Sequence, residues 1–137
     1  MAYEIPGTVV SLLSGSTTLK AYRIVRVSAL NTVVQTTGLS TGASAVFSVG
    51  VTQNGVPSPT TRTGLAVSVM VTGVTKVAAS SRAIAAGNLI RATSGAAATS
   101  GGLALPSSNS TPHVVGVALT SCAAGTIGAR FVSMRLF

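Results

Sequence analysis

Apolar and polar residues alternate along several short segments of the chain, and alternation with period two is typical of β-strands. The clearest case is residues 65–71, in which Val67, Val69 and Val71 share one parity. Similar segments predict a chain built from short strands. The expected strands are residues 7–13, 18–28, 32–36, 44–52, 65–71, 74–77, 89–92, 103–105, 114–119 and 127–136.

The segment 44–52 also alternates, which predicts that Phe47, Val49 and Val51 point inward. It is followed by residues 53–64, a stretch rich in Pro, Gly, Ser and Thr. These residues favour turns and irregular backbone, so we expect a long exposed loop there.

Turn signals divide the second half of the chain. Val71-Thr72-Gly73-Val74 predicts a hairpin between the strands on either side of it, and residues 78–86 have the small-residue content of a loop or one short helical turn. Residues 93–111 are rich in Gly, Ala and Ser around a strand-like centre. That composition is compatible with a loop or with a tight hairpin whose backbones approach closely.

A faint internal repeat links the two halves. Val49-Gly50-Val51-Thr52 is similar to Val115-Gly116-Val117-Ala118, and Ser68-Val69-Met70 is similar to Val132-Ser133-Met134. Two copies of one supersecondary unit would suit a barrel or a pair of sheets that close on each other.

The composition supports strands over helices. The 137 residues include 20 Ala, 19 Val, 18 Ser, 18 Thr and 15 Gly, whereas Glu, Lys, Gln and Met are scarce. Val and Thr favour pleated surfaces, and the scarce residues are good helix formers. The length fits one domain. We therefore expect a single all-β domain over residues 1–137, a small β-barrel or β-sandwich with long Ser/Thr/Gly-rich loops.

The chain contains few of the side chains that enzymes use for catalysis. Glu4 is the only acidic residue, His113 the only histidine and Cys122 the only cysteine. Paired-carboxylate catalysis, a Ser-His-Asp relay and a carboxylate-held cation each need more than this, and the three residues have no metal-ligand spacing. We therefore expect no enzyme activity, no catalytic residues, no cofactor and no metal site.

The formal net charge of +8 arises from nine cations set against one acid. Such a chain cannot pair its cations internally, so solvent, phosphate or an acidic protein surface is the natural partner of these cations. The cations are scattered, and only Lys20, Arg23 and Arg26 lie close together. A single-strand binder would interleave cations with stacking aromatics, which are only 4% of the chain. A small basic nucleic-acid-binding β-barrel is thus an alternative, with nucleic acid the less favoured partner.

The sequence contains no secretory signal and no apolar stretch near the ~20 residues that a membrane-spanning helix needs. We expect no membrane partner. Because Cys122 cannot form an internal disulfide, the sequence fits a reducing compartment.

Several motifs resemble, in order, those of the capsid decoration (cement) proteins of tailed bacteriophages. The resemblance covers about half of the chain. Its segments are Gly73-Val74-Thr75-Lys76-Val77, Ala83-Ile84-Ala85-Ala86-Gly87-Asn88-Leu89-Ile90, Val114-Val115-Gly116-Val117-Ala118-Leu119, Ala123-Ala124-Gly125 and the final strand, with Val49-Gly50-Val51-Thr52-Gln53-Asn54 upstream. Similar proteins often carry an acid where Asn88 stands and further acids in the Ala-Ala-Gly turn, which this chain lacks.

The resemblance implies a virion structural protein, assembled in the host cytoplasm and located on the capsid surface. It implies a homotrimer that binds the assembled head shell where major capsid proteins meet, and stabilises the shell by binding energy alone. We expect Arg23, Arg26 and Arg62 to contact carboxylates of the major capsid protein.

Overall fold

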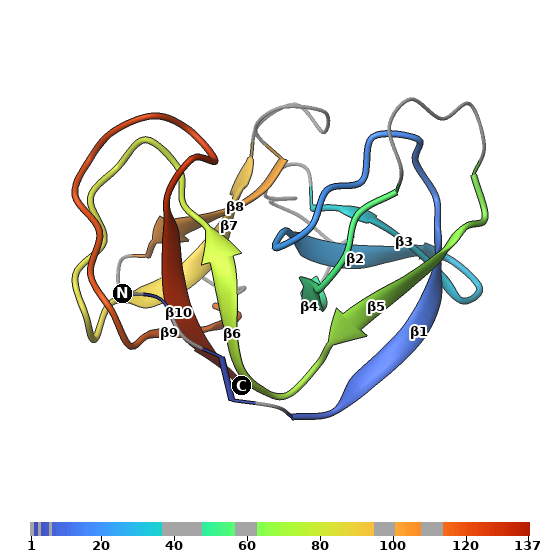
Figure 1. Ribbon diagram of the computed structural model, residues 1–137, viewed down its shortest axis with the longest axis horizontal. Helices are drawn as coiled ribbons and strands as arrows, with labels where there is room; N and C mark the ends of the chain where they lie inside the picture. The colour runs from blue at the N-terminus through green and yellow to red at the C-terminus, as the bar shows by residue number, and fades with distance from the viewer. Residues whose placement is uncertain are drawn as a thin grey trace, which may run out of the picture.

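The computed structural model describes residues 2, 4–5, 7–36, 48–56, 63–94, 101–107 and 114–137. These residues form ten β-strands and no helix, so the fold is all-β, as the sequence predicted (Figure 1). The strands are β1 (Val9–Ser14), β2 (Ile24–Ala29), β3 (Thr32–Gln35), β4 (Ser48–Thr52), β5 (Ala66–Met70), β6 (Gly73–Ala78), β7 (Leu89–Ser94), β8 (Gly101–Pro106), β9 (Gly116–Ala118) and β10 (Phe131–Leu136). No helix of these residues is long and apolar enough to cross a bilayer.

The first five strands close into a barrel in the order β1-β3-β2-β4-β5. Strands β1 and β3 pair in parallel, and the other neighbours pair antiparallel. Closure leaves no free sheet edge in this barrel. We call it the first unit.

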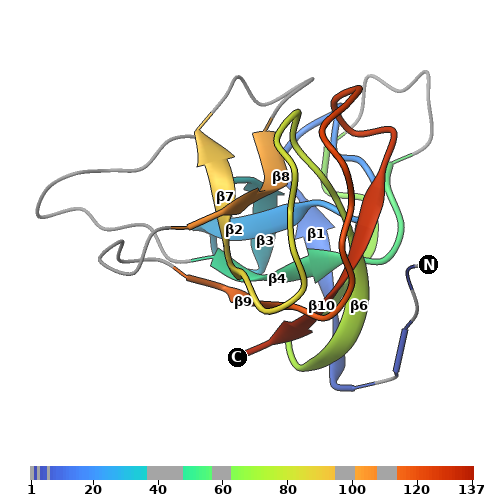
Figure 2. The same cartoon turned by 90° about the vertical axis from the view of Figure 1, so that its left-hand side faces the viewer.

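The last five strands form a second sheet in the order β6-β10-β9-β7-β8, which we call the second unit. Its two edge strands approach each other, because Ala79, directly after β6, makes a parallel bridge to Ala104 of β8. The two units lie side by side along the long axis of the molecule, with the first on the right of Figure 1 and the second turned toward the viewer in Figure 2.

Both units follow the same path. Read around each sheet, the order β1-β3-β2-β4-β5 matches β6-β8-β7-β9-β10, with the single parallel contact at the same place. The registers agree as well. Leu13 pairs with Ala66, and Ala78 and Phe131, each 65 residues later, pair with each other.

Irregularities also recur at matching places in the two units. The β2–β3 register shifts after Val27, and the β7–β8 register shifts after Ala92, which is the same point of the repeat. Just before β2 and β7 the backbone takes a positive φ at Tyr22 (57°) and at Gly87 (89°). The fold is therefore an internal duplication of one five-stranded unit.

The same positions fill the interior of both units. Five buried apolar residues of the first unit form one cluster, and each has a buried counterpart in the second. The pairs are Leu19 with Ile84, Val25 with Ile90, Val33 with Ala104, Val67 with Val132 and Val69 with Met134. Small and branched side chains thus fill a narrow barrel without large aromatics.

A shared core joins the units. Ile24, Val51 and Met70 of the first unit belong to the cluster that contains the interior of the second. Backbone hydrogen bonds add to this contact, since Ala78 N donates to Tyr22 O at 2.9 Å. At Gly102 of β8 an added Cβ would lie 2.4 Å from Ile24 O, so the close approach of β8 to β2 requires glycine.

The structure corrects the predicted hairpin at Val71-Thr72-Gly73-Val74. β5 pairs with β1 and β4, whereas β6 pairs with β10, so this turn connects the two units (Figure 1). Its local sequence is typical of a hairpin, but the partners of β6 come from more than 50 residues further along the chain.

Two predicted strands that lie wholly within the described residues begin four or more residues later than expected. The expected strand 18–28 starts only at Ile24, because the positive φ of Tyr22 breaks extended structure in front of it. The expected strand 127–136 starts only at Phe131, after a turn in which Gly128 has φ +70°.

The predicted face of residues 44–52 is only partly correct. Val51 is fully buried, whereas Val49 is partly buried and packs against the other core cluster. A register shift between Val25 and Arg26 interrupts the β2–β4 pairing and with it the alternation. Phe47 lies outside the described residues.

The described residues of the low-complexity region, 93–94 and 101–107, contribute to paired strands, in agreement with the hairpin alternative, and the rest of the region lies outside the described residues. β7 and β8 pair antiparallel across it, from Ile90 with Pro106 to Ser94 with Gly101. The predicted repeat is confirmed in position, since its segments fall on β4 and β9 and on β5 and β10. The strand registers, however, align Ser68 with Ser133 and not with Val132.

Candidate binding site

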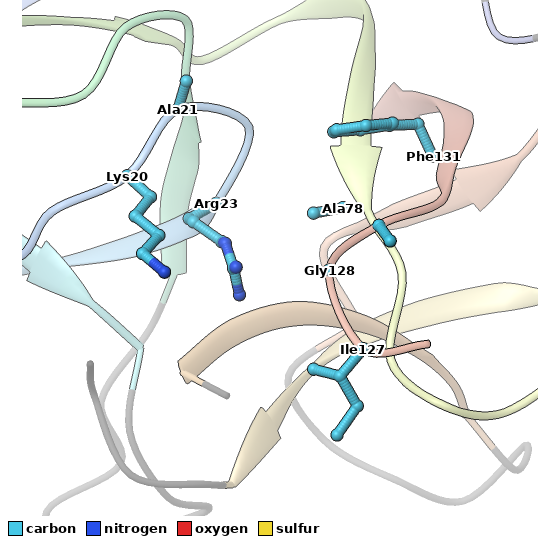
Figure 3. Close-up of a pocket in the computed structure, with 8 residues that line it drawn as sticks. Lys20, Ala21, Arg23, Ala78, Ile127, Gly128 and Phe131 are labelled. Atoms are coloured by element: carbon cyan, nitrogen blue, oxygen red, sulfur yellow. The ribbon is translucent and has the colours of Figure 1, made fainter. Parts of the chain in front are cut away.

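An open pocket of about 500 Å³ lies where the two units meet (Figure 3). One wall comes from the first unit, in the loop that leads into β2. The other wall comes from the end of β6, the start of β10 and the turn before β10. The lining residues are Lys20, Ala21 and Arg23 on the first wall and Ala78, Ile127, Gly128, Ala129 and Phe131 on the second.

A buried threonine holds the loop of the first wall in place. Thr52 Oγ1 donates to Lys20 O at 2.7 Å and accepts from Arg23 N at 3.1 Å. Tyr22 N donates to Thr52 O at 2.7 Å. The side chain of Gln35 accepts from Lys20 N at 3.0 Å. These contacts fix the Cα positions of both cationic residues, which makes the wall preorganised for a ligand.

Arg23 brings a cationic group into this wall with little solvent around it. The residue is 5% exposed, and its guanidinium Nη1 donates to Gly101 O at 3.3 Å. Burial lowers the pKa of Arg23 by penalising the charged form. An arginine nevertheless stays protonated in proteins, so the pocket contains a poorly solvated positive charge.

The chain offers Arg23 no carboxylate side chain. Its one acidic residue, Glu4, is exposed and does not line the pocket. A guanidinium has five N–H donors, and the one acceptor it has among the described residues is Gly101 O. Lys20, which is exposed, adds a second cation to the same wall (Figure 3).

The second wall approaches Arg23 closely at Gly128. This glycine has φ +70°, and an added Cβ would lie 2.9 Å from Arg23 Nη2. Gly128 N donates to Ala79 O at 2.9 Å, which ties the turn to the end of β6. Both the left-handed backbone and the small space favour glycine here.

Aromatic side chains from both units meet beside the pocket. The rings of Tyr22 and Phe131 pack edge to face, with centroids 5.6 Å apart and an interplanar angle of 82°. Lys76 Nζ lies 4.8 Å from the centroid of the Tyr22 ring, a distance suited to a cation–π interaction. Phe131 and Ile127 remain 39% and 50% exposed, so the second wall presents apolar surface next to the cations.

The structure describes two of the three arginines that the sequence selected, and they have different surroundings. Arg23 lines the pocket. Arg26, on β2, is half-buried and outside the lining, with an Nε that is buried and has no hydrogen-bond partner among the described residues. Arg62 lies outside the described residues.

Sequence reasoning did not select Lys20 or the second wall. Lys20 did have a signal, because it belongs to the one close group of cations. The sequence gives no signal for the second wall, Ile127, Gly128 and Phe131. These residues are more than 100 positions from Arg23 in the chain and lie near it only because the two units pack together.

Cys122 does not line the pocket. Cys122 is half-buried, and its Sγ accepts a hydrogen bond from Arg130 Nη1 at 3.5 Å. His113 lies outside the described residues. Among the residues that the structure describes, no three His, Cys, Asp or Glu residues group as metal ligands would.

The pocket cations belong to one half of the duplication. The positions of the second unit that match Lys20 and Arg23, counted by the register of β2 and β7, are Ala85 and Asn88. Asn88 Oδ1 accepts from Ala85 N at 2.9 Å, so the second unit builds this part of the loop with no cation at either matching position. The fold of the repeat therefore does not require Arg23 or Lys20.

No protein-family model matches the chain, and no curated protein matches it.

Proposed function

We propose that the protein is a virion structural protein, a capsid decoration or cement protein of a tailed bacteriophage. It binds the assembled head shell at junctions between major capsid proteins and acts as a homotrimer. The observation that carries this proposal is a rigid all-β body with a preorganised cationic pocket and no acidic side chain to fill it. The sequence motifs that resemble cement proteins supply the identity of the partner.

Binding energy is sufficient for this function. A ligand that binds only the assembled lattice stabilises the lattice by mass action, and the effect grows with the concentration of free ligand. A duplicated five-stranded unit with a shared core suits such a role, because a body that changes little on binding loses little conformational entropy. The cations then provide electrostatic complementarity to an acidic shell.

Co-sedimentation with mature capsids that lack the protein tests the proposal. We expect saturable binding at a fixed number of copies per shell, persisting at salt concentrations that remove the protein from duplex DNA. Arg26→Glu and Arg62→Glu, made singly and together, should weaken binding if these arginines pair with carboxylates of the shell, because each substitution reverses a charge. Unchanged occupancy of these variants at moderate salt would remove those two arginines from the interface.

The same experiment addresses the alternative function. The net charge of +8 favours a basic nucleic-acid-binding barrel as the second candidate. Binding to duplex DNA alone, with an affinity that falls linearly with the logarithm of salt concentration, would support that candidate against the cement function.

A further inference from the structure

We propose that the pocket between the two units binds one acidic side chain, a glutamate or aspartate, of a partner protein. This inference deepens the proposed function and rests on it only for the source of that side chain. The shared chemistry is a carboxylate held by Arg23 and Lys20, with apolar contact from the opposite wall.

The charge of the pocket selects an anion. Arg23 is 5% exposed and donates to Gly101 O, and the other N–H donors of its guanidinium have no acceptor among the described residues. Lys20 adds a mobile ammonium on the same wall. A charge that has lost solvent contacts gains more from an incoming carboxylate than an exposed one does, because the pair is less screened.

The opposite wall selects a side chain of a protein over a free inorganic ion. Ala78, Ile127 and Phe131 supply apolar surface beside the cations, and both of the larger residues are partly exposed. An inorganic oxyanion has no apolar part to cover this surface, whereas the methylene groups of a glutamate and the backbone around it do. At about 500 Å³ the pocket has room for such a side chain.

The pocket is not a requirement of folding. The corresponding loop of the second unit forms with Ala85 and Asn88 in place of Lys20 and Arg23. Burying an arginine without a carboxylate costs free energy, and the duplicated fold shows that the cost can be avoided. The cations therefore fit a binding role better than a structural one.

The test uses the full-length protein and short acetylated, amidated peptides that carry a single central glutamate or, as the matched probe, a single central glutamine. Titration is followed through backbone amide chemical shifts in two-dimensional NMR spectra. We expect the glutamate peptide to shift the amides of Ala21, Gly128 and Phe131 saturably. The glutamine peptide should shift them far less.

Variants separate the pocket from general charge. Lys20→Gln should lower the affinity for the glutamate peptide roughly two- to fivefold, the range for one exposed ion pair. Lys20→Arg, which keeps the charge, should retain the affinity of the unmodified protein. Arg135→Gln removes the same charge from an exposed position of β10 outside the pocket and should change the affinity less than twofold. Equal losses from Lys20→Gln and Arg135→Gln would overturn the pocket assignment.

A third probe distinguishes the source of the anion. Inorganic phosphate is titrated in the same way. If phosphate shifts the same amides more strongly than the glutamate peptide does, the proposal that the pocket binds an acidic side chain of a protein is wrong. If the glutamate peptide does not bind but the protein still binds capsids, the pocket assignment is wrong and the proposed cement function is unaffected. If the glutamate peptide binds but the protein does not bind capsids, the pocket assignment is supported and the proposed cement function is wrong.

Discussion

At the scale of single residues, the site depends on a few backbone positions that accept unusual geometry. Gly64 and Gly128 occupy matching turns of the two units, with φ of +76° and +70°, and donate to Ser14 O and Ala79 O. Their surroundings differ. A Cβ at Gly64 meets nothing within 4 Å, whereas one at Gly128 lies 2.9 Å from Arg23 Nη2.

This pair gives a matched mutational test. Gly64→Ala should reduce the free energy of unfolding by about 1–2 kcal/mol, the cost of a positive φ with a Cβ. Gly128→Ala should cost at least as much and should also weaken binding of the glutamate peptide, because Arg23 must move. Urea denaturation and peptide titration measure the two effects. If both variants bind the peptide like the unmodified protein, the position of Arg23 is not important for the pocket.

At the scale of the strands, equivalent positions should contribute equally to stability. Val67 of β5 and Val132 of β10 are both buried and occupy the same place in their units. Each valine-to-alanine change should cost about 2 kcal/mol, since both leave a cavity in a packed interior. Val9→Ala, at a valine 48% exposed on β1, is the control and should cost clearly less.

Calorimetry of the same variants tests the shared core. Ile24, Val51 and Met70 connect the interior of the second unit to the first. The protein should therefore unfold in one transition, with calorimetric and van't Hoff enthalpies in agreement. Two transitions, of which Val67→Ala shifts one and Val132→Ala the other, would show that the units unfold independently.

The sequence predicted the strands more successfully than their partners. Alternation located β5 and placed Val67 and Val69, which are both buried, on one face, because a half-buried strand needs only local information. The Val71–Val74 turn was assigned to a hairpin incorrectly, since the pairing of β6 with β10 depends on residues far along the chain. The positive φ of Tyr22 had no signal either, because such a conformation is uncommon outside glycine.

The candidate site was predictable only in part, for the same reason. Arg23 could be selected from the close group of cations. Its burial and the opposite wall could not, because they result from the packing of two units whose repeat is nearly invisible in sequence. Two units can share a fold while few of their residues are identical, because many combinations of small apolar side chains can fill the same interior.

At the scale of the whole molecule, duplication and asymmetry occur together. Both units share strand order, register and interior positions, yet the cations of the pocket are present in only one of them. The part that the units share is the strand framework, and the part in which they differ includes the cations of the described pocket.

The release temperature of the genome from mature capsids is the measurement that tests the cement function most directly. Capsids that lack the protein are heated with increasing concentrations of it, and DNA release is followed with an intercalating dye. We predict that the release temperature rises and reaches a plateau at the concentration where co-sedimentation saturates, as mass action requires. A release temperature that stays constant while the shells are fully occupied would contradict stabilisation of the capsid by this protein.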